Sequence, residues 1–210
     1  MTATTVHLVR HGEVYNPTGV LYGRLPGYSL SDRGRHMAEQ VAQALLDSDV
    51  TVVWCSPLER AVETAEPIAA VSGVQVDTDE RLIESENVFE GKTVGVGDGS
   101  LKNPSVWRHL WNPFRPSWGE PYEQVATRVL AAVAEARAVA RGHEAVLVSH
   151  QLPIEIARRR AENRHLWHRP DRRRCALASI TSLRYDGDRL IGVDYAEPAG
   201  DSGRQQVGGA

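Results

Sequence analysis

Apolar runs alternate with amphipathic segments along most of the chain. Runs rich in β-branched residues predict buried strands at 5–9, 50–55 and 144–149. Between and after them, apolar residues recur at a spacing of three and four, which predicts helices over 31–46, 56–73, 121–141 and 153–161. Two alternating segments, 177–185 and 189–195, flank an Asp-Gly-Asp turn and predict a hairpin. This order favours a single-domain layered α/β fold with a mostly parallel central sheet flanked by helices.

The helix expected over 56–73 has distinct start and stop signals. Ser56 is a suitable N-cap, Pro57 suits the first helical position, and Glu59 completes a capping box. Pro67 predicts a kink or a break within the helix, and Gly73 predicts its end.

Two segments depart from the alternation. Residues 95–119 hold four aromatic residues among prolines, glycines and charges, and they predict a long functional loop. Residues 199–210 are rich in Gly and polar residues and predict a disordered tail. We therefore expect one catalytic domain over 1–198.

Composition limits the classes of partner. With 210 residues, 41% of them hydrophobic, the chain can bury a sizeable core. A net charge of −3 gives no electrostatic case for nucleic acid or a membrane surface. Cys55 and Cys175 form neither a disulfide framework nor a zinc spacing. His165 and His168 have no nearby Cys or acidic cluster to complete a site, so no metal is expected. A cytoplasmic location is the corresponding expectation.

Ionisable residues stand where three of the predicted strands end. Arg10-His11-Gly12 follows the first strand, Cys55-Ser56 with Arg60 the second, and Ser149-His150 the third. In an open parallel sheet, ligands bind outside the carboxyl ends of the strands. Guanidinium groups suit phosphate oxygens, and a histidine among them can act as a nucleophile on phosphorus. The sequence thus predicts a phosphate pocket at this edge.

Five separated motifs, "LVRHGE", "LSDRG", "CSPLERAVETA", "RLIE" and "VLVSH", together resemble the histidine phosphatase superfamily, the phosphoglycerate-mutase-like group. The resemblance covers about residues 5–195, in the family's order. It implies that His11 is the phosphorylated nucleophile and that Arg10, Arg60 and His150 complete the phosphate pocket. It implies that Glu84 donates a proton to the leaving oxygen and then activates water, with no cofactor.

The sequence departs from the family pattern at several points. Asn16 matches an asparagine of the phosphate pocket but lies one residue closer to the Arg-His-Gly triplet than usual. Gln151 replaces the glycine that often follows the second histidine. The basic run "RPDRRRC" at 169–175 predicts a solvated face, with docking of an anion as the alternative.

These observations favour a phosphomonoesterase acting on a small phosphorylated metabolite. A cofactor-dependent phosphoglycerate-type mutase is the nearest alternative, and a non-catalytic module that binds phosphorylated ligands is the other. Trp107, Trp111 and Arg115 of the long loop are expected to contact the non-phosphate part of the substrate, although a purely structural cover is an equal alternative for the tryptophans. A homodimer is one option for self-association.

Overall fold

The computed structural model describes residues 3–88, 90–92 and 119–200. Its strands are β1 (Ala3–Arg10), β2 (Val50–Cys55), β3 (Val76–Thr78), β4 (Glu144–Ser149), β5 (Ile180–Asp186) and β6 (Arg189–Ala196). Its helices are α1 (Asp32–Ala44), α2 (Glu59–Ser72), α4 (Tyr122–Val139) and α5 (Gln151–Ala161). Two 3₁₀ turns are η1 (Glu80–Leu82) and η3 (Pro170–Arg172).

The strands form one sheet in the order β3-β2-β4-β1-β5-β6. From β3 to β1 all neighbours are parallel, whereas β5 pairs antiparallel with β1 and with β6. The mostly parallel α/β sheet predicted from the sequence is confirmed, as is the β5–β6 hairpin.

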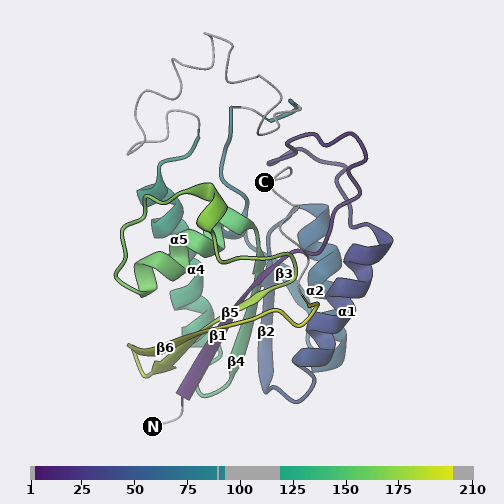
Figure 1. Ribbon diagram of the computed structural model, residues 1–210. Helices are drawn as coiled ribbons and strands as arrows, with labels where there is room; N and C mark the ends of the chain where they lie inside the picture. The colour runs from purple at the N-terminus through teal and green to yellow at the C-terminus, as the bar shows by residue number, and fades with distance from the viewer. Residues whose placement is uncertain (1–2, 89, 93–118, 201–210) are drawn as a thin grey trace.

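Two apolar cores cover the two faces of the sheet. Helices α4 and α5 pack on one face, where Val125, Val129 and Ile154 are buried against Leu8 and Leu147. Helices α1 and α2 pack on the other, around a buried set made of Val9, Met37, Val41, Ala65, Ile68 and Val146. Figure 1 shows the resulting three layers, with α4 and α5 on the left of the sheet and α1 and α2 on the right.

Helix α2 departs from the sequence prediction at its start and in its middle. It begins at Glu59 with Leu58 as N-cap and has no side-chain cap, so Ser56 and Pro57 lie before the helix. Ser56 instead faces His150, with Oγ 2.8 Å from its Nε2. Pro67 does not break the helix, which continues to Ser72 and ends at Gly73 (φ 68°). The flanking residues Ala65 and Ile68 are fully buried, and their packing outweighs the one backbone hydrogen bond that proline removes.

The remaining helices follow the prediction closely. Helix α1 has Ser31 as N-cap, whose Oγ accepts from Gly34 N at 3.0 Å. Helix α5 begins at Gln151, two residues earlier than expected, and α4 ends at Val139. Most of the long loop over 95–119, and residues 201–210 of the expected tail, lie outside the described residues.

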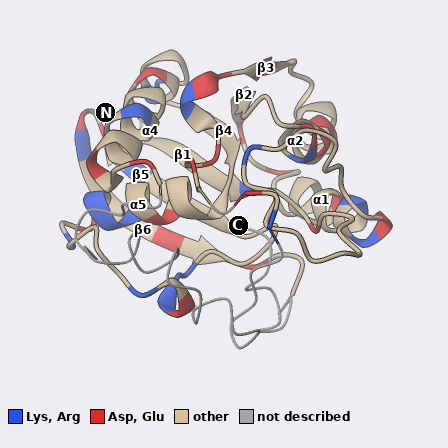
Figure 2. Ribbon diagram, turned by 90° about the horizontal axis from the view of Figure 1, so that it is seen from above, with Lys and Arg blue, Asp and Glu red and all other residues tan. Residues whose placement is uncertain are grey.

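Charged residues of both signs surround the sheet rather than gathering on one face. Figure 2 shows Lys and Arg interspersed with Asp and Glu on α1, α2 and α5 when the molecule is viewed from above. Within the described ranges, no helix is both long enough and apolar enough to cross a membrane.

Candidate active site

The register of the central strands brings the two predicted histidines together. Arg10 pairs with Ser149 across the parallel β1 and β4 strands, so the next residue of each strand, His11 and His150, leaves the sheet at the same level. Their ring centroids lie 5.1 Å apart. Both side chains are fully buried. Two imidazoles therefore share one enclosed position at the carboxyl edge of the sheet.

The contacts of His11 assign its tautomer. Nδ1 lies 2.8 Å from the Gly12 carbonyl oxygen, so Nδ1 carries the proton and donates it. Nε2 is buried and has no hydrogen-bond partner among the described residues. Burial, together with the charges of Arg60 and Arg10, holds the pKa of His11 well below its usual 6.5. His11 is thus neutral at neutral pH, with the lone pair of Nε2 available for attack.

His150 is held from the neighbouring strand. Its Nε2 shares a 2.8 Å hydrogen bond with Oγ of Ser56, which follows β2, and its Nδ1 has no partner in the described part of the chain. Burial lowers the pKa of His150 well below 6.5, and the nearby charge of Arg60 adds to the effect. His150 forms the N-cap of α5, where the positive end of the helix also favours a bound anion.

Arg10 and Arg60 are buried cations, and among the described residues they are anchored by carbonyl groups and not by carboxylates. Nη1 of Arg10 donates to Cys175 O at 2.7 Å, and Nη2 of Arg60 donates to Gly23 O at 2.6 Å. Nε of Arg10 and both Nε and Nη1 of Arg60 have no partner among the described residues. Buried guanidinium groups whose donors lack acceptors are what an anion-binding pocket needs.

Glu84 lies close enough to Arg60 for its charge to act on the guanidinium group, and it lines a cavity together with Ser85, Tyr122 and Arg173. Its side chain is nearly fully buried. Oε1 accepts from the Ser85 backbone N at 2.8 Å, and Oε2 has no partner within the described segments. This free oxygen is the atom of Glu84 best placed to hold or receive a proton.

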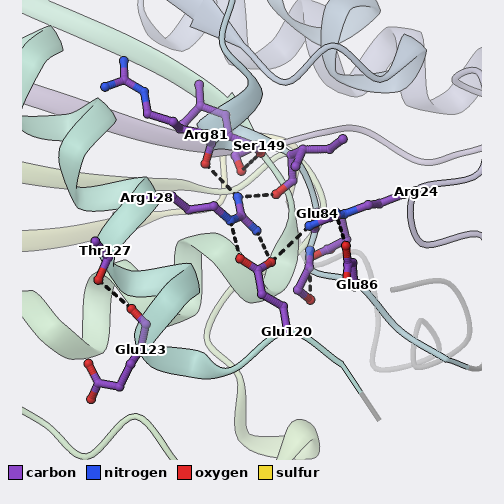
Figure 3. A network of polar contacts seen from close by, with 12 residues as sticks. Arg24, Arg81, Glu84, Glu86, Glu120, Glu123, Thr127, Arg128 and Ser149 are labelled. Atoms are coloured by element: carbon purple, nitrogen blue, oxygen red, sulfur yellow. Dashed lines mark hydrogen bonds and ion pairs between the residues drawn. The ribbon is translucent and has the colours of Figure 1, made fainter. Parts of the chain in front are cut away.

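Side chains from three other segments fix the backbone that leads to Glu84 (Figure 3). Arg128 Nη1 donates to the carbonyl oxygens of both Arg81 and Ile83 at 2.7 Å. Ser149 Oγ donates to Leu82 O at 2.6 Å, and Arg24 Nε donates to Glu84 O at 2.6 Å. Four successive carbonyl groups are therefore held by side chains.

Glu120 joins the two arginines of this arrangement. Its carboxylate accepts from Arg128 Nε at 2.8 Å and from Arg24 Nη2 at 3.1 Å. We call Arg24, Glu120 and Arg128 the Glu84 clamp. Its three members come from distant parts of the sequence and fix one short segment.

Gly12 permits a close approach between the site and α1. A Cβ at Gly12 would lie 2.5 Å from the Gly34 carbonyl oxygen, so a larger residue would push α1 away from the end of β1. The Gly12 N–H donates to Thr64 Oγ1 of α2 at 3.1 Å. Glycine therefore lets the loop after His11 fit between two helices.

The other predicted binding residues are not brought into this cluster by described contacts. Asn16 is occupied within its own loop, where Nδ2 donates to Val20 O at 2.8 Å and Oδ1 accepts from Val20 N at 3.1 Å. Its role in phosphate binding stays a prediction. Trp107, Trp111 and Arg115 lie outside the described residues.

Several residues at the site were not singled out for this role by sequence reasoning. Ser56 orients His150, and the buried ring of Tyr22 lies below Arg60, with 4.7 Å between Cζ and the ring centroid. Arg173, from the basic run at 169–175, lines the cavity that also contains Glu84. The sequence did contain a signal for Arg173, because docking of an anion was the alternative interpretation of the basic run that includes it.

A mostly parallel α/β sheet with paired histidines and arginines at its carboxyl edge defines a class of α/β protein with an anion-binding pocket at the ends of its strands. The sequence comparison identifies the family: the model of the histidine phosphatase superfamily (branch 1) matches residues 6–197, and the chain belongs to this superfamily.

Similar proteins include both phosphatases and mutases. A protein of Mycobacterium tuberculosis is 58% identical over 93% of this chain and 97% of its own length. A 2,3-bisphosphoglycerate-dependent phosphoglycerate mutase of Thermoplasma acidophilum is 31% identical over 71% of this chain and 72% of its own. The structure of a mycobacterial glucosyl-3-phosphoglycerate phosphatase superposes with a TM-score of 0.73 at 25% identity, covering 92% of this chain and 97% of that one.

Proposed function

We propose that this protein is a phosphomonoesterase that hydrolyses a small phosphorylated metabolite through a phosphohistidine on Nε2 of His11. The observation that carries the proposal is the fixed tautomer of His11. Nδ1 donates to the Gly12 carbonyl group, while Nε2 is buried without a partner among the described residues. A neutral imidazole with one free lone pair is the form that can attack phosphorus.

In the first step, Nε2 forms a bond to phosphorus as the bond from phosphorus to the ester oxygen breaks. Glu84, in its protonated form, gives its proton to that leaving oxygen. Arg10, Arg60 and His150 surround the equatorial oxygens and stabilise their negative charge.

In the second step, water attacks the phosphohistidine and gives a proton to the Glu84 carboxylate. The bond from phosphorus to nitrogen breaks, which releases inorganic phosphate and restores neutral His11 and protonated Glu84. The two steps together consume one water and return every protein group to its starting state.

Trapping of the intermediate tests this proposal. Rapid quenching of the enzyme with a ³²P-labelled phosphomonoester should give a label that is stable to base and labile to acid, as expected for a phosphoramidate. His11→Asn should carry no label and should lose activity by a factor on the order of 10⁴ or more. His143→Asn, a change at an exposed histidine whose side chain bonds only Asp49 among the described residues, should behave as wild type. Full activity in His11→Asn would remove the mechanism.

A mutase is the second candidate, because the chain is 31% identical to a phosphoglycerate mutase over 71% of its length. It would retain the phosphoryl group on His11 and return it to another hydroxyl group of the same substrate skeleton. Release of inorganic phosphate supports the phosphatase, migration of phosphate between hydroxyl groups supports the mutase, and binding with neither reaction supports a non-catalytic module.

A further inference from the structure

The cavity beside Glu84 receives the leaving group if the proposed function is correct. Its lining includes Glu84, Ser85, Tyr122, Leu152 and Arg173. Because Glu84 protonates the ester oxygen, the rest of the alcohol must lie next to Glu84. The lining residues therefore face the part of the substrate that distinguishes one phosphomonoester from another.

Two charged groups of the cavity wall, Arg173 and Glu84, form no ion pair with any other described residue. Glu86 pairs with Arg24, and Glu120 pairs with Arg24 and Arg128. Glu84 and Glu155 are the carboxylates whose charges act on Arg173, and neither is within ion-pair distance of it. A partly buried cation without a carboxylate partner is costly unless a ligand supplies the anion.

Two neutral acceptors fix the position of Arg173. Its Nη1 donates to Gln151 Oε1 at 2.8 Å, and its Nε donates to His168 Nε2 at 3.1 Å. His168 can accept because its Nδ1 donates to Leu166 O at 2.7 Å, which places the imidazole proton on the other nitrogen. The His168 ring in turn lies 5.7 Å from the Tyr122 ring, centroid to centroid.

This arrangement leaves part of the guanidinium available. The two hydrogen bonds use two of the five N–H groups that a guanidinium carries, and the others have no partner among the described residues. The neighbours Arg169 and Arg174 are engaged elsewhere, with Asp171 and with the Tyr195 ring. Arg173 is thus a preorganised donor that faces the cavity.

We propose that Arg173 binds a second anionic group, of the carboxylate type, on the leaving-group part of the substrate. This inference rests on the proposed function and names its substrate class: phosphorylated hydroxy acids are preferred over phosphate esters of neutral alcohols. Arg173 is a specificity-determining residue, and Gln151 and His168 are positioning residues for it.

The test uses two ligands that differ at one group. 3-Phosphoglycerate has a carboxylate where glycerol 3-phosphate has a hydroxymethyl group. Each is used as a competitive inhibitor of 4-nitrophenyl phosphate hydrolysis by wild type, Arg173→Gln and Arg172→Gln. Arg172 is the matched control, because it is adjacent and exposed and lines a different cavity from the one that contains Glu84.

Wild type should bind phosphoglycerate about tenfold or more tightly than glycerol phosphate, as expected for a charge-assisted hydrogen bond. Arg173→Gln should remove most of this preference and change the inhibition constant of glycerol phosphate by about twofold or less. Arg172→Gln should keep the preference. Arg173→Lys retains the charge without the planar fork, so its preference for 3-phosphoglycerate should lie between those of Arg173→Gln and wild type. It also serves as the second variant should Arg173→Gln not fold.

Three results overturn the inference: no preference in wild type, an unchanged preference in Arg173→Gln, or an equal loss for both ligands. The last result would mean that Arg173 acts on Glu84 or on the phosphate pocket. If wild type hydrolyses no phosphomonoester at all, the proposed function fails by itself. Calorimetric titration of the same two ligands then still decides whether Arg173 recognises the carboxylate.

Discussion

At the scale of single residues, the buried neutral histidines link stability to pH. The pKa values of His11 and His150 lie well below 6.5 in the folded protein, mainly because of burial. The unfolded chain therefore binds more protons as the pH falls below about 6.5, and the free energy of unfolding should fall there by up to about 1.4 kcal/mol per pH unit for each histidine.

Urea unfolding in phosphate-free buffer at pH 7.5 and 5.5 measures the slope of the free energy of unfolding against pH. It should flatten in the His11→Gln/His150→Gln double variant and not in His143→Gln. An unchanged slope in the double variant would contradict the buried neutral state.

Arg60 carries the second prediction at this scale. It is fully buried and offers Nε and Nη1 to a ligand while Gly23 O holds Nη2. Lysine keeps the charge but not the planar fork, so Arg60→Lys should lower kcat/KM by about 10- to 100-fold. Arg33→Lys, at an exposed arginine paired with Glu13, is the control and should keep full activity. Steady-state kinetics with 4-nitrophenyl phosphate decides the point, and equal activity of the two variants would mean that Arg60 does not bind the phosphoryl group as a fork.

At the scale of elements, the Glu84 clamp predicts a positioning effect on the acid. Glu120→Gln weakens the bonds to Arg24 and Arg128, so the segment from Arg81 to Glu84 should become less ordered. The expected result is a larger loss of kcat for an alkyl phosphate, whose leaving oxygen needs a proton, than for 4-nitrophenyl phosphate. Single-turnover kinetics isolates the transfer step. Glu123→Gln, at an exposed carboxylate in the first turn of α4, is the control. If kcat falls equally for both substrates and in parallel with the melting temperature, the clamp stabilises the fold and does not position the acid.

The elements also show what local sequence signals can and cannot predict. Strand β2 and the cap at Ser31 follow from β-branched residues and from capping chemistry, both of which act over a few neighbouring residues. The predicted start of α2 is wrong because Ser56 bonds a histidine that lies 94 positions away in the sequence. Of the kink or break predicted at Pro67, the break does not occur, because buried neighbours on the same helix hold it against the sheet.

At the scale of the whole molecule, the rule that ligands bind at the carboxyl ends of parallel strands predicts which motifs meet. It brings His11 to His150 because β1 and β4 are neighbours in register. The rule does not extend to Arg173, which lies in a 3₁₀-containing connection whose path no strand pattern determines. Only tertiary structure separates Arg173, which lines the cavity, from Arg172, which is exposed.

The long segment over 95–119 carries the remaining prediction, because a phosphate pocket alone treats phosphomonoesters alike. Most of it lies outside the described residues, but its last residue, Gly119, pairs with Asn87, and both line the cavity that contains Glu84. The described end of the segment therefore lies at the cavity that contains Glu84. Trp107→Ala, Trp111→Ala and Arg115→Ala should change the relative kcat/KM among natural phosphomonoesters by more than they change that of 4-nitrophenyl phosphate. Ile191→Ala, at an exposed apolar residue of the edge strand β6, serves as the control. If all substrates lose activity in proportion to the melting temperature, the segment is a structural cover and does not select substrates.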